Sequence, residues 1–137
     1  MTPKQYLNQA RHLDALINSR LREIDYWKDM STSISGSSSD GMPHNPNRST
    51  EAHFVKCLAK VEEKQEDVEM KVTWLIRLRD EISSRIDLLH NPSEQLVLRY
   101  HYLDNYTWEE IAALMNVSLR TVYRIHGEAL QHFSVPN

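Results

Sequence analysis

The sequence predicts an all-α protein, a long antiparallel helical hairpin or coiled coil followed by a C-terminal domain of three helices. The chain has 137 residues, which suits one domain or two small ones. Only three of them are glycines, which leaves little material for the tight turns of a β-protein. Apolar residues recur at steps of three and four over long stretches, and helix-capping patterns open several of these stretches.

Composition excludes several classes of protein. With 16 Lys and Arg against 19 Asp and Glu the net charge is -3, so a uniformly basic nucleic-acid coat is excluded, although a local basic face is not. The single cysteine, Cys57, excludes an intramolecular disulfide and most zinc frameworks and fits a reducing cytosol. No apolar run approaches the ~18 residues of a membrane helix, and the N-terminus has no signal-like core. We therefore expect a soluble, cytoplasmic protein without a membrane partner.

The first helix is expected to begin at the N-terminus. Thr2 can cap it, Pro3 suits its first turn and Gln5 can complete a capping box. One apolar stripe then runs for about seven turns: Tyr6, Ala10, Leu13, Ile17, Leu21, Ile24 and Trp27. Residues 31–49 hold seven serines, two glycines and two prolines, which predicts a flexible linker.

The second helix is expected from Ser49 or Thr50 to about Leu89. Its apolar seam has the heptad rhythm of a coiled coil: Phe54, Leu58, Val61, Gln65, Val68, Val72 and Leu75. A helix of ~40 residues is ~60 Å long, so a second copy of the chain is the simplest cover for it, and we expect residues 1–90 to form an oligomerisation region, with a dimer favoured. If the chain is a monomer, the first helix must fold back along residues 51–90. Gln65 either fixes register or oligomeric state or is a solvated position where the stripe drifts.

Residues 91–137 are expected to form a separate domain. Asn91 as cap, Pro92 in the first turn and Glu94 begin a helix that ends near Asp104 and Asn105. Thr107 begins a short helix that runs through Met115, with Trp108 as a packing residue between helices. The last helix is expected from Leu119 to about Phe133.

The last two helices have the pattern of a helix-turn-helix. Ala112 is small where the helices cross, Asn116 suits a turn at positive φ, and Ser118 can cap the following helix. Four residues are expected to face inward: Val117, Val122, Ile125 and Ala129. Five are expected to face outward: Leu119, Arg120, Thr121, Tyr123 and Arg124. Arg120 and Arg124, one turn apart, can reach guanine edges or phosphates of DNA.

Residues 91–133 resemble region 4 of bacterial sigma factors, the module that reads the promoter −35 element and docks on the RNA polymerase flap. The resemblance rests on Val97-Leu98-Arg99, on the stretch from Tyr106 to Ala112, on the Asn116-Val117-Ser118 turn and on Ala129-Leu130. The whole layout also resembles small regulators encoded by phages and prophages of Gram-positive bacteria. Nothing resembles sigma region 2, so the chain is not expected to melt a −10 element unaided.

The resemblance implies that the start of the last helix enters the major groove and that Arg99 contacts the DNA backbone. The implied DNA-contact residues are Arg99, Ser118, Leu119, Arg120, Thr121, Tyr123 and Arg124. The sequence departs from the family at Leu119, where a polar or basic residue is usual. It also departs at His126, Gln131 and His132, in a stretch that is often rich in Lys and Arg.

The expected function is a DNA-binding transcriptional regulator of promoter or operator DNA, with RNA polymerase as a candidate second partner. Residues 91–137 hold three arginines against five acids, so one copy should bind weakly, with a salt slope of about −2 to −3. A dimer that reads half-sites ~34 Å apart doubles the contacts. Two alternatives stay open: a module that docks on RNA polymerase without binding DNA, and a DNA-packaging adaptor of the phage small-terminase type.

No catalytic, metal or cofactor site is expected. Cys57 and His53 lie one helical turn apart, but no orienting group or oxyanion donor accompanies them, and a buried apolar Cys57 is expected. Four other histidines have no acidic partners at metal spacing and are expected at the surface or satisfied internally: His90, His101, His126 and His132. We therefore do not expect an enzyme.

Overall fold

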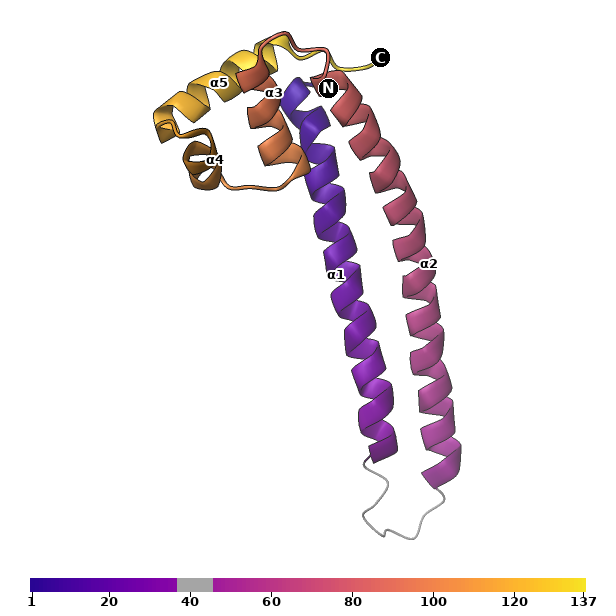
Figure 1. Cartoon of the computed structure of the whole chain (residues 1–137). Coiled ribbons are helices and arrows are strands. Elements are labelled where there is room, and N and C mark those ends of the chain that lie inside the picture. Colours follow the sequence, from indigo (N-terminus) through magenta and orange to yellow (C-terminus); the bar gives the residue numbers. More distant parts are fainter. Residues whose placement is uncertain (37–45) are drawn as a thin grey trace. The chain divides into compact units, whose positions relative to one another are not determined.

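A computed structural model describes the backbone of residues 1–36 and 46–137 and the side chains of residues 1–32 and 51–137. Every regular element in this part of the chain is helical, which confirms the all-α prediction (Figure 1). The elements are α1 (Pro3–Gly36), α2 (Pro46–Ile86), α3 (Pro92–Leu98), the π-helical segment η2 (Arg99–Leu103), α4 (Trp108–Met115) and α5 (Leu119–His132). No helix among these residues is both long and apolar enough to span a membrane.

The chain forms two compact units, each of which takes parts of α1 and α2. One unit holds residues Met1–Asp14 and Trp74–Asn137, and the other holds Ala15–Thr73. The first unit therefore combines the start of α1 and the end of α2 with the three C-terminal helices. The division at residue 90 that the sequence predicts is untested, and this shared unit leads us to expect that residues 91–137 do not fold by themselves.

The core of the first unit joins residues that are far apart in the sequence. Its buried members come from α1, α2 and the C-terminal helices: Tyr6, Leu7, Ala10, Leu78, Ile82, Ile86, Leu89, Leu98, Tyr102, Leu103, Ala129 and Phe133. Tyr6 and Phe133 rings lie 5.9 Å apart, and Arg79 Nη1 donates to the carbonyl of Leu103 at 2.6 Å. The long helices thus supply one wall of the core on which α3 and α5 pack.

The N-terminal capping box is present as predicted. The amide of Thr2 donates to Oε1 of Gln5 at 2.9 Å, and the amide of Gln5 donates to Oγ1 of Thr2 at 3.2 Å. Because both free amides are satisfied, α1 begins at Pro3.

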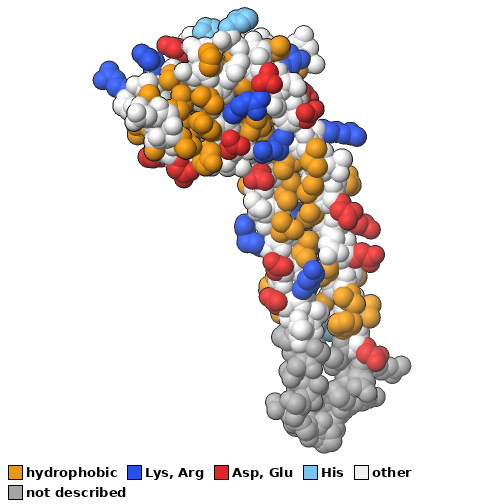
Figure 2. Space-filling view, in the orientation of Figure 1, with side chains coloured by type: hydrophobic (Ala, Val, Ile, Leu, Met, Phe, Trp, Pro, Cys, Tyr) orange, Lys and Arg blue, Asp and Glu red, His pale blue; other side chains and the backbone are white. Residues whose placement is uncertain are grey.

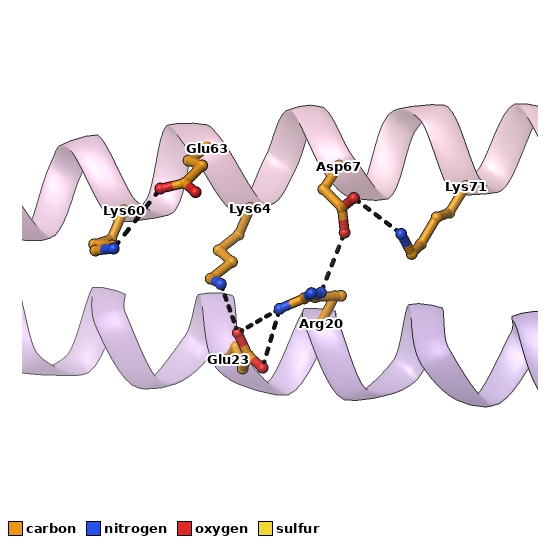
Figure 3. A network of polar contacts seen from close by, with 7 residues as sticks. All are labelled: Arg20, Glu23, Lys60, Glu63, Lys64, Asp67 and Lys71. Atoms are coloured by element: carbon orange, nitrogen blue, oxygen red, sulfur yellow. Dashed lines mark hydrogen bonds and ion pairs between the residues drawn. The ribbon is translucent and has the colours of Figure 1, made fainter.

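In the second unit α1 and α2 lie antiparallel. Arg20 pairs with Asp67 at 3.2 Å and Glu23 pairs with Lys64 at 3.1 Å (Figure 3). Residue numbers therefore rise along α1 while they fall along the facing stretch of α2. Four apolar side chains are buried along the interface: Ile17, Ile24, Cys57 and Val61. The predicted burial of Cys57 is confirmed.

Only part of the predicted coiled-coil seam lies against α1. Val61 is buried and Val68 is half-buried, whereas four seam residues are exposed: Phe54, Leu58, Gln65 and Val72. The reason is that α1 folds back along α2 and covers one side of the seam. The first helix thus folds back along residues 51–90, one of the two arrangements that the sequence left open.

The predicted linker at residues 31–49 was too long at both ends. Helix α1 continues to Gly36 and α2 already begins at Pro46, while residues 37–45 lie outside the described part. Ser31 and Thr32 lie within α1, where their hydroxyls donate to the carbonyl of Lys28 at 2.7 and 2.6 Å. Proline is tolerated in a first helical turn, which allows the start at Pro46.

Candidate nucleic-acid interface

Helix α3 begins as the sequence predicts and continues into a wider turn. Asn91 Oδ1 accepts from the amide of Ser93 at 2.9 Å, and Pro92 is the first helical residue. After Leu98 the backbone changes to the π-helical η2, in which the amide of Asp104 donates to the carbonyl of Arg99. The predicted end near Asp104 is confirmed, whereas the π-helical turn has no signature in the sequence.

The turn between α4 and α5 has the geometry of a helix-turn-helix. Thr107 Oγ1 caps α4 by accepting from the amide of Glu110 at 3.2 Å. Asn116 has φ 55° and ψ 47°, the left-handed conformation predicted for it, which ends α4. Ser118 then caps α5, since its Oγ accepts from the amide of Thr121 at 3.1 Å.

A small core beneath the turn fixes the two helices. Its buried residues are Val97, Ile111, Val122 and Ile125. Ala112, Met115 and Val117 pack against them while partly exposed. Ala129 is buried in the larger core of the same unit, so the predicted inward set of α5 is confirmed.

The opposite side of α5 presents a surface that we call the reading face, formed by Arg120, Tyr123 and Arg124. All three side chains are exposed, and Tyr123 is 48% exposed. The first turn of α5 contains no acidic residue, so the positive end of the helix dipole is not neutralised there. The structure thus brings three of the predicted contact residues onto one surface.

The other predicted contact residues lie beside this face or apart from it. Leu119 and Thr121 are half-buried, and Ser118 is exposed, with its Oγ 2.8 Å from Oγ1 of Thr121. Arg99 belongs to η2, and its Nη2 donates to Ser83 Oγ at 2.8 Å and pairs with Asp87 at 2.6 Å. Arg99 is therefore held by the end of α2, and its contact with DNA stays a prediction.

Behind the reading face lies a set of rings that we call the imidazole cluster: His101, Tyr102, Trp108 and His126. His101 stacks on Trp108, whose ring also meets His126 edge-on with the centroids 4.6 Å apart. Trp108 meets Tyr123 of the reading face edge-on at 5.7 Å. The predicted packing role of Trp108 is confirmed, but its partners come from separate elements and leave no pattern in the sequence.

Both imidazoles of the cluster are held neutral at pH 7. Burial and the nearby Arg11 guanidinium lower the pKa of His101 to about 4, and burial lowers the pKa of His126 to about 4. In the neutral tautomer that fits, His101 Nδ1 donates to the carbonyl of Tyr106 at 3.1 Å, which leaves Nε2 to accept from Arg11. Tyr102 donates to Nε2 of His126 at 2.7 Å, and burial raises the pKa of Tyr102 to about 12.

His132 has an acidic partner inside the fold, which is one way in which a histidine can be satisfied internally, as expected from the sequence. Its Nδ1 lies 2.6 Å from Oε1 of the buried Glu94. The two residues are far apart in sequence and meet because α3 packs on α5. In the part of the chain with described side chains, no three His, Cys, Asp or Glu residues gather as a metal site.

Comparison with known proteins bears on the same segment. Residues 91–133 match the family Sigma-70, region 4. The match begins at the cap of α3, includes α4, the turn and α5, and ends one residue beyond α5. It identifies α4 and α5 as a helix-turn-helix of the DNA-binding kind. Neither the comparison with curated proteins nor that with solved structures gave a match.

Proposed function

We propose that this chain is a transcriptional regulator that binds promoter or operator DNA by inserting the start of α5 into the major groove. The observation that carries the proposal is the reading face. Arg120 and Arg124 stand four residues apart on an exposed surface of α5, which is the spacing of one helical turn. Arginine donates two parallel hydrogen bonds to guanine or pairs with phosphate, so both side chains suit duplex DNA.

The residues beside the reading face extend the proposed contact. Leu119 offers an apolar surface that suits a thymine methyl group, and the hydroxyls of Ser118 and Thr121 suit phosphate or base acceptors. The bonds from Arg99 to Ser83 and Asp87 all use Nη2. Its Nε and Nη1 groups take no part in these bonds, and we propose them as donors to a DNA phosphate. The function proposed is binding, and it requires no catalytic group or cofactor.

The small number of positive charges supports a regulator that binds DNA as a homodimer, and we propose the cytoplasm as its compartment. Residues 91–137 contain three arginines and no lysine, so one copy makes few phosphate contacts, binds DNA weakly and has only a shallow dependence of affinity on salt. Two copies that read half-sites ~34 Å apart double the number of contacts. RNA polymerase is the second partner that we propose, because the matched family segment covers the whole of α3 to α5.

Selection of bound sequences from random DNA, followed by mobility shift on the selected site, tests the proposal. The double variant Arg120→Ala, Arg124→Ala should lose sequence-specific binding. The matched control is Arg22→Ala, Arg77→Ala, which removes two exposed arginines elsewhere on the long helices and should bind as the wild type does. Undiminished specific binding by the first variant would refute the reading face.

A second candidate function is docking on RNA polymerase without DNA binding. The observation that favours it is the acidic character of the same segment, where Glu109, Glu110 and Glu128 are exposed. These carboxylates repel DNA phosphates. Capture of purified polymerase by a protein with no DNA affinity at low salt would select this candidate over the first.

A further inference from the structure

The start of α1 contacts the segment between α3 and α4 through two polar side chains. Arg11 Nη1 donates to Nε2 of His101, and Asn105 Nδ2 donates to Oδ2 of Asp14 at 3.3 Å. His101 belongs to η2, and Asn105 lies in the loop that leads from η2 to α4. All four residues belong to the first unit. The first turns of α1 therefore hold, at two points, the segment that precedes the helix-turn-helix.

The ring of His101 is held by contacts on its edge and on its face. Arg11 donates to Nε2, and Nδ1 donates to the carbonyl of Tyr106 at 3.1 Å. The face of the ring stacks on Trp108, with the centroids 3.7 Å apart. His101 is buried, so an apolar side chain in place of Arg11 would leave Nε2 without a donor. We expect the ring then to turn toward another donor, which weakens its stack on Trp108.

Trp108 in turn contacts Tyr123 of the reading face. The indole and phenol rings meet edge-on, with their centroids 5.7 Å apart. Tyr123 is 48% exposed, so its ring can contact DNA and Trp108 at the same time. A tyrosine on a helix has two common χ1 rotamers, and the contact with Trp108 favours one of them. The orientation of the exposed ring is therefore set before DNA binds.

The charges around the reading face make a well-oriented aromatic contact important. Arg120 and Arg124 are exposed, but so are three carboxylates on α4 and α5: Glu109, Glu110 and Glu128. Over the C-terminal helices, Figure 2 shows apolar side chains gathered among charged ones of both signs. Because the opposite charges offset one another, the long-range attraction to DNA is small. Short-range contacts of the reading face then contribute a larger share of the affinity.

We propose that Arg11 is a positioning residue of the reading face. It holds His101 against Trp108, and Trp108 in turn fixes the ring of Tyr123 toward one base pair of the bound DNA. The inference rests on the proposed function, in which α5 enters the major groove. The edge of the tyrosine ring suits a thymine methyl group, and its hydroxyl suits a base or phosphate acceptor. Arg11 acts on DNA through Tyr123 and makes no contact with DNA itself.

Mobility shift of the full chain on the selected site and on its single-base-pair variants tests this role. Arg11→Met keeps an apolar stem but has no donor for His101. It should lower the affinity roughly fivefold, the cost of ordering one side chain on binding. Its base preference should weaken at one position and stay unchanged where Arg120 and Arg124 bind. Arg11→Lys keeps a donor and should bind as the wild type does. Arg22→Met, which replaces an exposed arginine of α1, is the matched control and should also bind as the wild type does.

A second substitution separates positioning from a loss of folded protein. In a Tyr123→Ala background the positioned ring is absent, so Arg11→Met should change the affinity by no more than about twofold. Partial unfolding would instead lower binding to every sequence equally, and a direct phosphate contact of Arg11 would persist without Tyr123. An unchanged base preference in Arg11→Met, an equal loss of affinity in both backgrounds, or the same loss in Arg11→Lys would overturn the positioning role and leave the proposed function standing. A wild type that selects no sequence would refute the proposed function and this role with it.

Discussion

The imidazole of His101 lies flat on the indole of Trp108, with ring centroids 3.7 Å apart and planes inclined by 17°. The stack joins η2 to the first residue of α4. Trp108 also meets Tyr123 of the reading face and His126 one turn further along α5. An exposed residue proposed to contact DNA is therefore supported from behind by a ring whose own position depends on the π-helical segment.

Replacing Trp108 with alanine is expected to destabilise the first unit by roughly 2–3 kcal/mol. Full burial would make the loss larger, but Trp108 is only half-buried. Urea unfolding followed by circular dichroism measures the change. Trp74→Ala is the control, because Trp74 is 63% exposed and its loss should cost about 0.5 kcal/mol or less. Equal losses for the two variants would show that the Trp108 stack contributes nothing specific.

Acidification from pH 7 to pH 4.5 is expected to weaken the fold through His101 and His126. Each has a folded-state pKa of about 4, against an ordinary value of 6.5. The unfolded chain therefore takes up protons first as the pH falls, and stability is lost from about pH 6.5 downward until the folded pKa is reached. Each unit of difference corresponds to at most ~1.4 kcal/mol per group.

Thermal melts between pH 7 and pH 4.5 check this expectation. His126→Gln should flatten the dependence of Tm on pH, because glutamine keeps an acceptor for the Tyr102 hydroxyl but takes up no proton. His12→Gln removes an exposed histidine and should leave the slope unchanged. If both variants follow the wild-type slope, His126 is not the group responsible.

Two substitutions of Asn116, to alanine and to glycine, are expected to have different effects on the stability of the fold. The φ of Asn116, 55°, is left-handed, a conformation that costs an ordinary side chain roughly 1–2 kcal/mol and glycine almost nothing. Asn116→Ala should therefore lower the stability by about 1 kcal/mol, whereas Asn116→Gly should match the wild type or exceed it. Chemical unfolding of the two variants side by side measures the difference, and a reversed order would contradict the turn geometry.

Local patterns in the sequence predicted local structure well. Thr2, Asn91, Thr107 and Ser118 each cap the helix that follows them. Such caps depend on side chains within three residues of the amide that they satisfy, so the sequence of a short segment is enough to predict them. The same holds for the left-handed turn at Asn116.

The same reasoning could not predict contacts between segments that are distant in the sequence. Arg11 and His101 are 90 residues apart and meet only because the start of α1 packs against η2. The pairs of Arg20 with Asp67 and of Glu94 with His132 depend likewise on which helices become neighbours. Helical periodicity shows that a face is apolar but not which face covers it. For that reason the seam of α2 was predicted while its partial cover by α1 was left as one of two arrangements.

A fragment of residues 91–137 is expected to lose its cooperative fold. In the whole chain, Leu98, Tyr102 and Phe133 belong to a core whose other wall is formed by Leu7 and Ile82, with their neighbours on α1 and α2. The fragment would expose that apolar surface to water at a cost of roughly 25 cal/mol per Å². A broad, non-cooperative melt with binding of a hydrophobic dye should result. A chain that joins residues 1–14 to 74–137 through a short glycine and serine linker should melt cooperatively, because it restores both walls. A sharp melt of the 91–137 fragment would instead establish that the helix-turn-helix segment folds by itself.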